Sequence, residues 1–364
     1  MDKSSNKPSS VTVADVARKA GVSKATAARV LGGYGIVSDR VREAVTTAAR
    51  LLEYRTNELA RSMTTGRSGS IGVVVGDIEN PFFSLAVRGI TDIARRAGFT
   101  VILINSGEDA DTERAAVRTL LSKRVDGLIV SPARDNDVEH LKEATRSGLP
   151  LVLLDRGSEA LEVDTVIADD RHAAESVTRQ LIALGHRRIA YITACDTPDH
   201  CFRSVDDINT GSVRRRIAGY LGVCAEAGLA GMEEWVRVGA VKPDETQRIV
   251  THMLRSPKPP TAIIASDSMI ALEVFKVHRE LGLRIPDDVS LVSFHDADWT
   301  SVTTPPVTVV RQPVYNLGAT AAELLVERLN GTGQVPRKVV LKTEIVQRAS
   351  TREAQGAAGH PVLS

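Results

Sequence analysis

Three side chains able to carry chemistry lie together in the stretch VSFHDADW, residues 292–299. His295, Asp296 and Asp298 follow an apolar run, and such a cluster can bind a metal, perform acid–base catalysis or grip a ligand. Because His295 and Asp296 are neighbours on a segment expected to be extended, their side chains diverge, which argues against a metal site or a catalytic pair. The role of the cluster therefore depends on the elements around it.

Other motifs with a chemical meaning are few. Cys195, His200 and Cys201 in CDTPDHC imitate metal ligands, but their spacing fits no standard zinc pattern. The sequence has no GxGxxG that opens a helix after a strand, no Walker motif, no GxSxG and no HExxH. No nucleophile–base pair is recognisable either. The sequence therefore predicts a protein that is not an enzyme and needs no metal or cofactor.

Length and composition are typical of a multidomain globular protein. The 364 residues are too many for one ordinary core, and 43% of them are hydrophobic. No run of about 18 apolar residues is present to span a membrane. The N-terminus MDKSSNKPSS lacks the apolar segment of a signal peptide, and the three cysteines have no framework spacing. We therefore expect a protein of the reducing cytoplasm.

Charge is distributed unevenly along the chain. Residues 1–66 hold 11 Lys and Arg against 6 Asp and Glu, whereas the remaining residues hold 35 against 39. A basic head on a mildly acidic body indicates an anionic partner for the head, nucleic acid first. Charge alone still favours the plainer alternative of a solvated basic face.

The periodicity of TVADVARKAGVSKATAARVL, residues 12–31, predicts two short helices joined by a tight turn. Thr12 is suited to cap the first helix, with Asp15 as its capping-box partner. Gly21 ends that helix, Ser23 caps the second, and Ser38 caps a third. Such a pair of helices has the geometry of a DNA-reading helix-turn-helix, while a plain three-helix bundle is the alternative.

The outer face of the second helix suits a major groove of DNA. Ser23 and the helix N-terminus can hold a phosphate. Arg29 can pair with guanine, which is worth about 1–3 kcal/mol of base discrimination. Ala25 and Ala28 are small enough for a close approach to the bases, and Lys24 adds charge. These features make the plain bundle less favoured without excluding it.

After residue 69 short apolar strands alternate with helical segments. IGVVVGDI, TVILINS, DGLIVS and PLVLLDR form a first set of strands, and DTVIAD, RIAYIT, EEWVRVG, AIIAS and VSLVSF form a second. The alternation predicts an α/β body of two lobes, each a parallel sheet with helices on both faces. Ligands of such sheets bind beyond the carboxyl ends of the strands, which is where the VSFHDADW cluster falls.

Residues 11–66 resemble the head of the lactose-repressor (LacI/GalR) family of bacterial transcription regulators. DVARKAGVSKATAARVL, VSDRVREAV and NELARSMTTGR match that family's motifs nearly in order. The family's Thr-Val-Ser-Arg reads Thr26-Ala27-Ala28-Arg29 here, so Ala28 loses a hydroxyl contact. NELARSM resembles the family's minor-groove hinge, with Met63 where the family places a wedging leucine. The expected DNA contacts are Thr12, Ser23, Lys24, Ala25, Thr26, Arg29, Asn57, Ala60, Arg61 and Met63.

The resemblance continues to about residue 350 and implies a body with the fold of periplasmic sugar-binding proteins. NPFF, LDR, ALGHRRIAYIT, RIAGY, RIPDDVSLVSF and VRQP are the matching landmarks. The resemblance implies two aromatics that stack on an effector, two ligand-binding arginines and a hinge-side amide. A plainer role for Phe82 is that of a loop aromatic closing a core. The expected effector contacts are Phe82, Phe83, Arg156, Arg216, Ser266, His295 and Gln312.

Three positions of the expected pocket depart from the family's pattern. His295 stands where the family has the first Asp of Gly-Phe-Asp-Asp, Ser266 stands for an Asn, and Val241 for an aromatic. A missing carboxylate beside two arginines favours an anionic or carbonyl-rich effector, such as a sugar acid or a phosphorylated sugar.

Two alternatives remain for the residues that follow Phe294. Asp296 or Asp298 could hold His295 away from the ligand, or Asp296 could take the vacated role.

The sequence and the resemblance together predict the organisation of the chain. The protein should be a homodimeric repressor on a pseudo-palindromic double-stranded DNA operator, controlled by a small-molecule effector. The residues after 350 have no heptad pattern, so the sequence does not indicate a tetramer formed by a C-terminal coiled coil. The alternatives are a free solute-binding protein of the same body fold and an α/β enzyme. The expected segments are a disordered N-terminus (1–10), a helix-turn-helix domain (11–56), a hinge helix and linker (57–69), lobe 1 (about 70–163 and 300–332), lobe 2 (about 164–299 and 333–350) and a flexible tail (351–364).

Overall fold

The computed structural model describes residues 11–33, 35–54, 66–195, 197, 200–333 and 335–354. The chain divides after Gly69 into two compact units, the head and the body. None of the helices among the described residues has the length and apolar character needed to cross a membrane.

In the described part of the head, three helices pack around a small core. They are α1 (Val13–Ala20), α2 (Lys24–Gly32) and α3 (Asp39–Leu51). Gly21 and Gly33 follow α1 and α2 in the left-handed conformation, which a residue with a Cβ adopts at a cost. The Thr12–Asp15 capping box and the Ser23 cap are both present, whereas the Ser38 hydroxyl makes no capping hydrogen bond. The fully buried core side chains are Val16, Ala17, Ala27, Val45 and Ala48.

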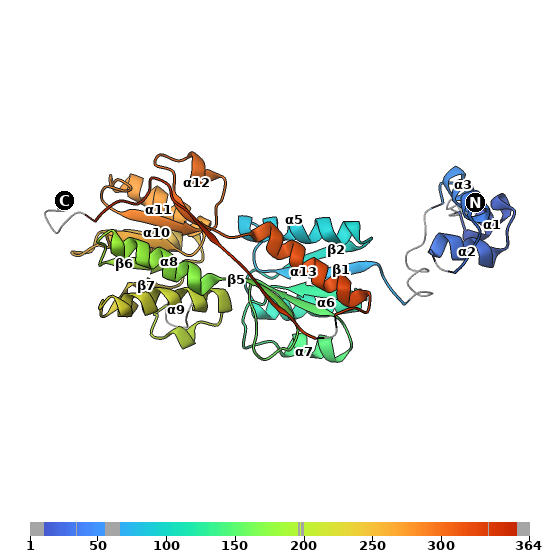
Figure 1. Cartoon of the computed structure of the whole chain (residues 1–364), viewed down its shortest axis with the longest axis horizontal. Coiled ribbons are helices and arrows are strands. Elements are labelled where there is room, and N and C mark those ends of the chain that lie inside the picture. The colour runs from blue at the N-terminus through green and yellow to red at the C-terminus, as the bar shows by residue number, and fades with distance from the viewer. Residues whose placement is uncertain are drawn as a thin grey trace, which may run out of the picture. The chain divides into compact units, whose positions relative to one another are not determined.

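Among its described residues the body has two six-stranded sheets. Each sheet belongs to one of the two lobes that Figure 1 shows. The first sheet has the order β11-β5-β4-β3-β1-β2, and all its pairs are parallel. Its strands are β1 (Ser70–Val75), β2 (Thr100–Asn105), β3 (Gly127–Val130), β4 (Leu151–Leu154), β5 (Asp164–Ala168) and β11 (Lys338–Leu341).

The second sheet has the order β12-β10-β9-β8-β6-β7 and is parallel except for the β10–β12 pair. Its strands are β6 (Ile189–Ile192), β7 (Val236–Arg237), β8 (Ala262–Ala265), β9 (Ser290–Phe294), β10 (Thr308–Arg311) and β12 (Glu344–Val346).

Helices cover both faces of each sheet because the inner strands are apolar on both sides. On the first sheet, α5 (Pro81–Arg96) and α13 (Val314–Leu329) lie together on one face (Figure 1), and α6 (Ala110–Ser122) and α7 (Glu139–Arg146) pack on the other. On the second sheet, the pairs are α8 (Asp170–Ala183) with α9 (Gly211–Glu226) and α10 (Pro243–Leu254) with α11 (Ser268–Glu280).

The remaining elements are short. They are the 3-10 turns η1 (Val205–Asp207) and η2 (Met232–Trp235) and the single-turn helix α12 (Trp299–Val302).

The expected division between the lobes is wrong in three places. Strand β5 (164–168) belongs to the first sheet, where it pairs with β4 and β11. Strand β10 (308–311) belongs to the second sheet, and β11 (338–341) returns to the first. The chain thus crosses between the lobes after β5, after β10 and after β11. An apolar strand carries no local mark of its sheet, because sheet membership depends on hydrogen-bond partners far along the chain.

The described part of the expected tail is held to the second lobe. Just before that tail, the Leu291 amide donates to the Ser350 carbonyl oxygen at 2.9 Å, and the Ser350 hydroxyl donates to the Leu291 carbonyl oxygen at 2.5 Å. Within the tail, the Arg352 amide donates to the Ser290 hydroxyl oxygen at 3.2 Å. The Ala354 amide donates to the Leu184 carbonyl oxygen at 2.8 Å. A flexible tail beginning at residue 351 is therefore wrong for residues 351–354; the later residues lie outside the described ones.

Candidate DNA-reading face and effector cleft

One face of α2 projects its side chains from the head. Lys24, Ala25 and Arg29 are exposed, whereas Ala27 is fully buried against α1 and α3 and Ala28 is half-buried. Within the described residues, neither Lys24 nor Arg29 makes a hydrogen bond or an ion pair. The charged groups are thus available to a partner, as the major-groove prediction requires.

The capping hydroxyls of the head are already engaged. The Ser23 Oγ accepts from the Thr26 amide at 3.1 Å and lies 2.8 Å from the Thr26 hydroxyl. Thr12 donates through its hydroxyl to Asp15 at 2.7 Å, and this bond lowers the pKa of the Asp15 carboxyl. The Thr12, Ser23 and Thr26 hydroxyls stabilise helix ends first, and a DNA contact would be shared with that role.

The remaining expected DNA contacts, Asn57, Ala60, Arg61 and Met63, lie outside the described residues. They stay predictions of the resemblance.

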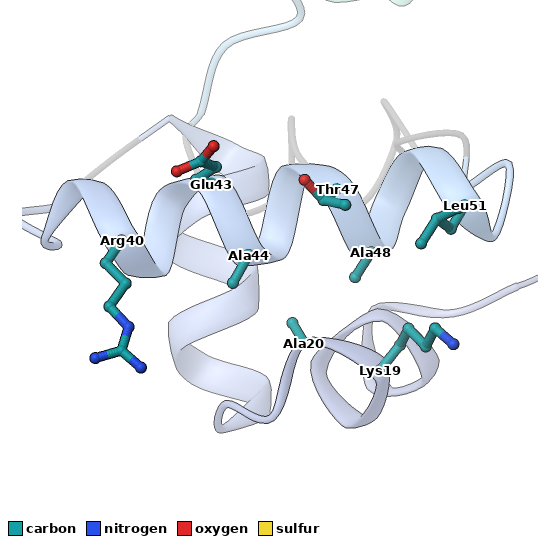
Figure 2. Close-up of a pocket in the computed structure, with 8 residues that line it drawn as sticks. All are labelled: Lys19, Ala20, Arg40, Glu43, Ala44, Thr47, Ala48 and Leu51. Carbon is teal, nitrogen blue, oxygen red and sulfur yellow. The ribbon is translucent and has the colours of Figure 1, made fainter.

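A groove of about 390 Å³ lies between α1 and α3 (Figure 2). Lys19 and Ala20 line it from α1, while Ala44, Ala48 and the exposed Leu51 line it from α3. None of its lining residues comes from α2, so it is separate from the predicted DNA-reading face.

In the body, the expected effector residues come together at the carboxyl ends of strands. Phe82 and Phe83 begin α5 after β1, and Arg156 follows β4 in the first lobe. In the second lobe, His295 follows β9 and Ser266 follows β8. The rings of Phe82 and His295 meet across the lobes with centroids 6.1 Å apart. The strand ends of the two sheets therefore face each other at the junction of the two lobes, a region called the cleft here.

Arg216 and Gln312 complete the expected set. Arg216 projects from α9, and Gln312 lies on the crossover between β10 and α13, which agrees with its predicted hinge-side place. Both side chains are buried, and the Gln312 Nε2 has no partner in the described chain.

Phe82 and Phe83 have a structural role as well as a place in the cleft. Both are buried in the core of the first lobe and contact each other edge to face at 5.3 Å. The plainer prediction for Phe82 is therefore correct in part, because the ring is buried in the core, although it also contacts His295.

The two cleft arginines are each paired with carboxylates. Arg156 donates to both oxygens of Glu108, at 2.5 and 2.9 Å, and to the Pro132 carbonyl oxygen at 3.1 Å. Arg216 donates through Nε to Asp170 at 2.8 Å. Burial opposes both charges, yet the carboxylates beside them raise the pKa of each guanidinium.

Arg216 has two further contacts that orient it. Its Nη1 donates to the Ser266 carbonyl oxygen at 2.9 Å, and its guanidinium stacks 4.4 Å from the centre of the Phe294 ring. The contact of Arg216 with position 266 uses the backbone, so this contact does not depend on the side chain at that position.

His295 presents a neutral imidazole to the cleft. Burial lowers its pKa to about 4, with a smaller opposing effect from Asp296. Its Nδ1 is buried and has no partner in the described chain. Its backbone is left-handed, with φ at 68°, a conformation that residues other than glycine rarely adopt. A neutral imidazole supplies one donor and one acceptor to a ligand.

Asp296 is turned away from the cleft. Its carboxylate accepts from Arg311 at 2.8 and 2.9 Å, from Arg348 at 2.7 Å and from the Thr300 hydroxyl at 2.8 Å. These bonds hold the pKa of Asp296 below its usual value, although burial opposes them. Neither alternative involving Asp296 therefore fits: it neither holds His295 nor is free to take its place.

Sequence reasoning missed two carboxyl groups of the cleft and a buried hydroxyl group near Arg216. Asp155 is buried, and its Oδ1 has no partner while its Oδ2 accepts from Ser212 at 3.2 Å. Burial raises the pKa of Asp155 and also that of Asp267, which caps α11. Tyr191 lies in β6 with an unpartnered hydroxyl. Asp155 could have been found, because it precedes Arg156 in the LDR landmark.

These carboxylates remove the reason to expect an anionic effector. That expectation assumed two arginines left unopposed once the family's Asp became His295. Around Arg156 and Arg216 the structure instead places four carboxylates, those of Glu108, Asp155, Asp170 and Asp267. In the described part of the chain, no group of three or more His, Cys, Asp or Glu side chains is arranged to hold a metal ion.

The chain matches known proteins along most of its length. Residues 12–57 match the bacterial regulatory proteins of the lacI family, and residues 68–349 match the periplasmic binding proteins and sugar binding domain of the LacI family. The "HTH-type transcriptional repressor PurR" of Vibrio campbellii is 31% identical over 94% of this chain and 99% of its own. "Catabolite control protein A" of Priestia megaterium is also 31% identical, with the same coverage.

Solved structures agree in fold. A lac repressor dimer bound to operator and the anti-inducer ONPF has a TM-score of 0.80 at 27% identity, covering 94% of this chain and 99% of that one. A CelR–cellobiose complex has a TM-score of 0.67 at 28% identity, covering 93% and 99%. The chain belongs to the lacI family of bacterial transcription regulators and combines its helix-turn-helix head with its effector-binding body.

Proposed function

We propose that the protein is a dimeric repressor whose hold on a pseudo-palindromic operator is set by an uncharged, sugar-like effector in the body cleft. A protein that acts on the chromosome works in the bacterial cytoplasm. Binding and release of the effector, without chemical change to it, would be the signal.

The observation that supports the proposal is that one chain has both a face suited to DNA and a cleft suited to a small ligand. The α2 face exposes Lys24 and Arg29 with no competing partner in the described residues. The cleft gathers unpartnered polar atoms of Asp155, His295 and Gln312 at the strand ends. Buried polar atoms without partners are costly, so a ligand that satisfies them gains binding energy. A free solute-binding protein would have no use for the first surface.

The chemistry of the cleft favours a ligand rich in hydroxyl groups. The free Asp155 oxygen accepts hydrogen bonds, the neutral His295 donates or accepts one, and the Gln312 amide donates. Related structures carry cellobiose and ribose. An effector would regulate DNA binding only if its affinity differs between the two states of the repressor.

A gel-shift assay on DNA from around the protein's own gene tests the regulator. We expect a specific complex that weakens steeply between two salt concentrations, because contacts with phosphates release counterions. A shuffled fragment of equal length is the control. Equal, weak binding to both fragments would refute the proposed function.

Calorimetric titration tests the effector class. Ribose, cellobiose and glucose are compared with gluconate and glucose 6-phosphate, and we expect binding only among the neutral sugars. Tighter binding of an acid or a phosphate would contradict an uncharged effector.

A further inference from the structure

Glu108 lies in the loop between β2 and α6, at the cleft end of the first sheet. Its carboxylate grips the Arg156 guanidinium through two parallel hydrogen bonds, at 2.5 and 2.9 Å. The arginine side chain is 9% exposed, whereas that of Glu108 is 38% exposed. The paired carboxylate therefore sits between a buried cation and the solvent, where an anionic ligand would otherwise bind.

Two features of the backbone serve this placement. Glu108 has a left-handed conformation with φ at 60°, which is unfavourable for a residue with a Cβ. Gly76, after β1, leaves the space that the carboxylate fills, because a Cβ there would lie 2.0 Å from the Glu108 Oε1. The backbone conformation of Glu108 and the space beside Gly76 together allow the Glu108 carboxylate to reach Arg156.

The Glu108 carboxylate also reaches the opposite lobe electrostatically. Burial is the main cause that raises the pKa of Asp267 on the second lobe, and the charge of Glu108 contributes to it. Glu108 and Asp267 thus place one carboxyl group from each lobe near the cleft arginines.

We propose that Glu108 determines effector specificity by occupying Arg156 as a built-in anion, which excludes carboxylates and phosphates from the cleft. The inference rests on the proposed effector site. Arg156 then has a structural role in the cleft, and the effector would bind to the unpartnered polar atoms of Asp155, His295 and Gln312. A negatively charged effector would have to displace the Glu108 carboxylate from its bidentate pair with the buried Arg156.

Inorganic phosphate is the probe, used on the full chain by isothermal titration calorimetry. We expect no saturable binding of phosphate to the wild type. Glu108→Gln keeps the shape but releases Arg156, so it should bind phosphate saturably, with a dissociation constant at least about tenfold below the highest phosphate concentration at which the wild type shows no binding. The double variant Glu108→Gln/Arg156→Gln should lose that gain.

A second variant reaches the same state without touching either charge. Gly76→Ala places a methyl group where the carboxylate lies, so it should push Glu108 off Arg156 and also create phosphate binding. Glu327→Gln is the matched control, because it removes the carboxylate that pairs with Arg337 at 2.7 Å elsewhere on the first lobe. It should gain no phosphate site.

Three outcomes would overturn the inference. The first is saturable phosphate binding by the wild type that Arg156→Gln abolishes, a measurement that needs neither the Glu108 nor the Gly76 variant to fold. The second is a folded Glu108→Gln that gains no phosphate binding. The third is an equal gain in Glu327→Gln. Gel shifts with the same proteins separate this failure from that of the proposed function, since loss of specific DNA binding by the wild type would refute only the latter.

Discussion

Arg29 on the exposed face of α2 is the side chain expected to read a base. It is exposed and free of ion pairs within the described residues, so Arg29→Ala should change the stability of the head by no more than about 0.5 kcal/mol. A bidentate arginine–guanine contact is worth about 1–3 kcal/mol of discrimination, or about 5-fold to 150-fold in affinity for each head. Two heads on a symmetric operator would double the free energy.

The assay begins by selecting the sequences that the wild type prefers from random double-stranded DNA. Fluorescence anisotropy then gives the affinity of each protein for the selected site and for its single-base variants. Arg29→Ala should lose the preference at one guanine of each half-site and keep the others. Lys24→Ala is the matched control, because a phosphate contact weakens all sequences alike and lowers the salt slope by about one for each head.

The reasoning would be refuted by a folded Arg29→Ala protein that keeps every base preference of the wild type. It would also be refuted by a loss of affinity spread evenly over all sequences, which would make Arg29 a phosphate contact. Circular dichroism of the variant separates either result from unfolding of the head.

Three further predictions concern the body. Burial lowers the pKa of His295 to about 4, so between about pH 6.5 and 4 the unfolded chain binds a proton at His295 that the folded protein does not bind. Acidification over this range should therefore lower the free energy of unfolding. His295→Gln should flatten that part of the stability-against-pH curve measured by urea unfolding, and an unchanged curve would contradict the reasoning. Gly318→Ala should destabilise the protein by about 1–3 kcal/mol or more, because its Cβ would lie 1.9 Å from the Ala86 carbonyl oxygen. Gly222→Ala is the control: its Cβ would enter open space, so the variant should be neutral or stabilising. Equal unfolding midpoints of the two variants would contradict the prediction. Arg214 of the second lobe forms an ion pair of 2.5 Å with the buried Asp135 of the first lobe, and Arg214→Gln breaks it. Hydrogen exchange at the Asp135 amide, which donates to Asn209, should then become about fivefold faster, because local opening costs about 1 kcal/mol less. Unchanged exchange would show that the pair does not hold the lobes together.

Much of the head followed from local sequence. Thr12 with Asp15, Gly21 and Ser23 mark where helices begin and end, because capping and left-handed turns depend on neighbours within four residues. The exposed face of α2 followed from the same periodicity. The alternation of apolar strands with helical segments likewise predicted two α/β lobes, and it predicts a ligand site at the strand ends.

Tertiary structure alone decided the chemistry of the cleft. The pairing of Glu108 with Arg156, 48 residues away, and of Asp170 with Arg216, 46 residues away, reversed the charge balance inferred from His295. The assignment of β5, β10 and β11 to their sheets was equally beyond the sequence. Strand periodicity and caps are local properties that a stretch of sequence carries by itself. Which carboxylate reaches which arginine, and which strand joins which sheet, depends on contacts between distant segments that exist only once the chain has folded.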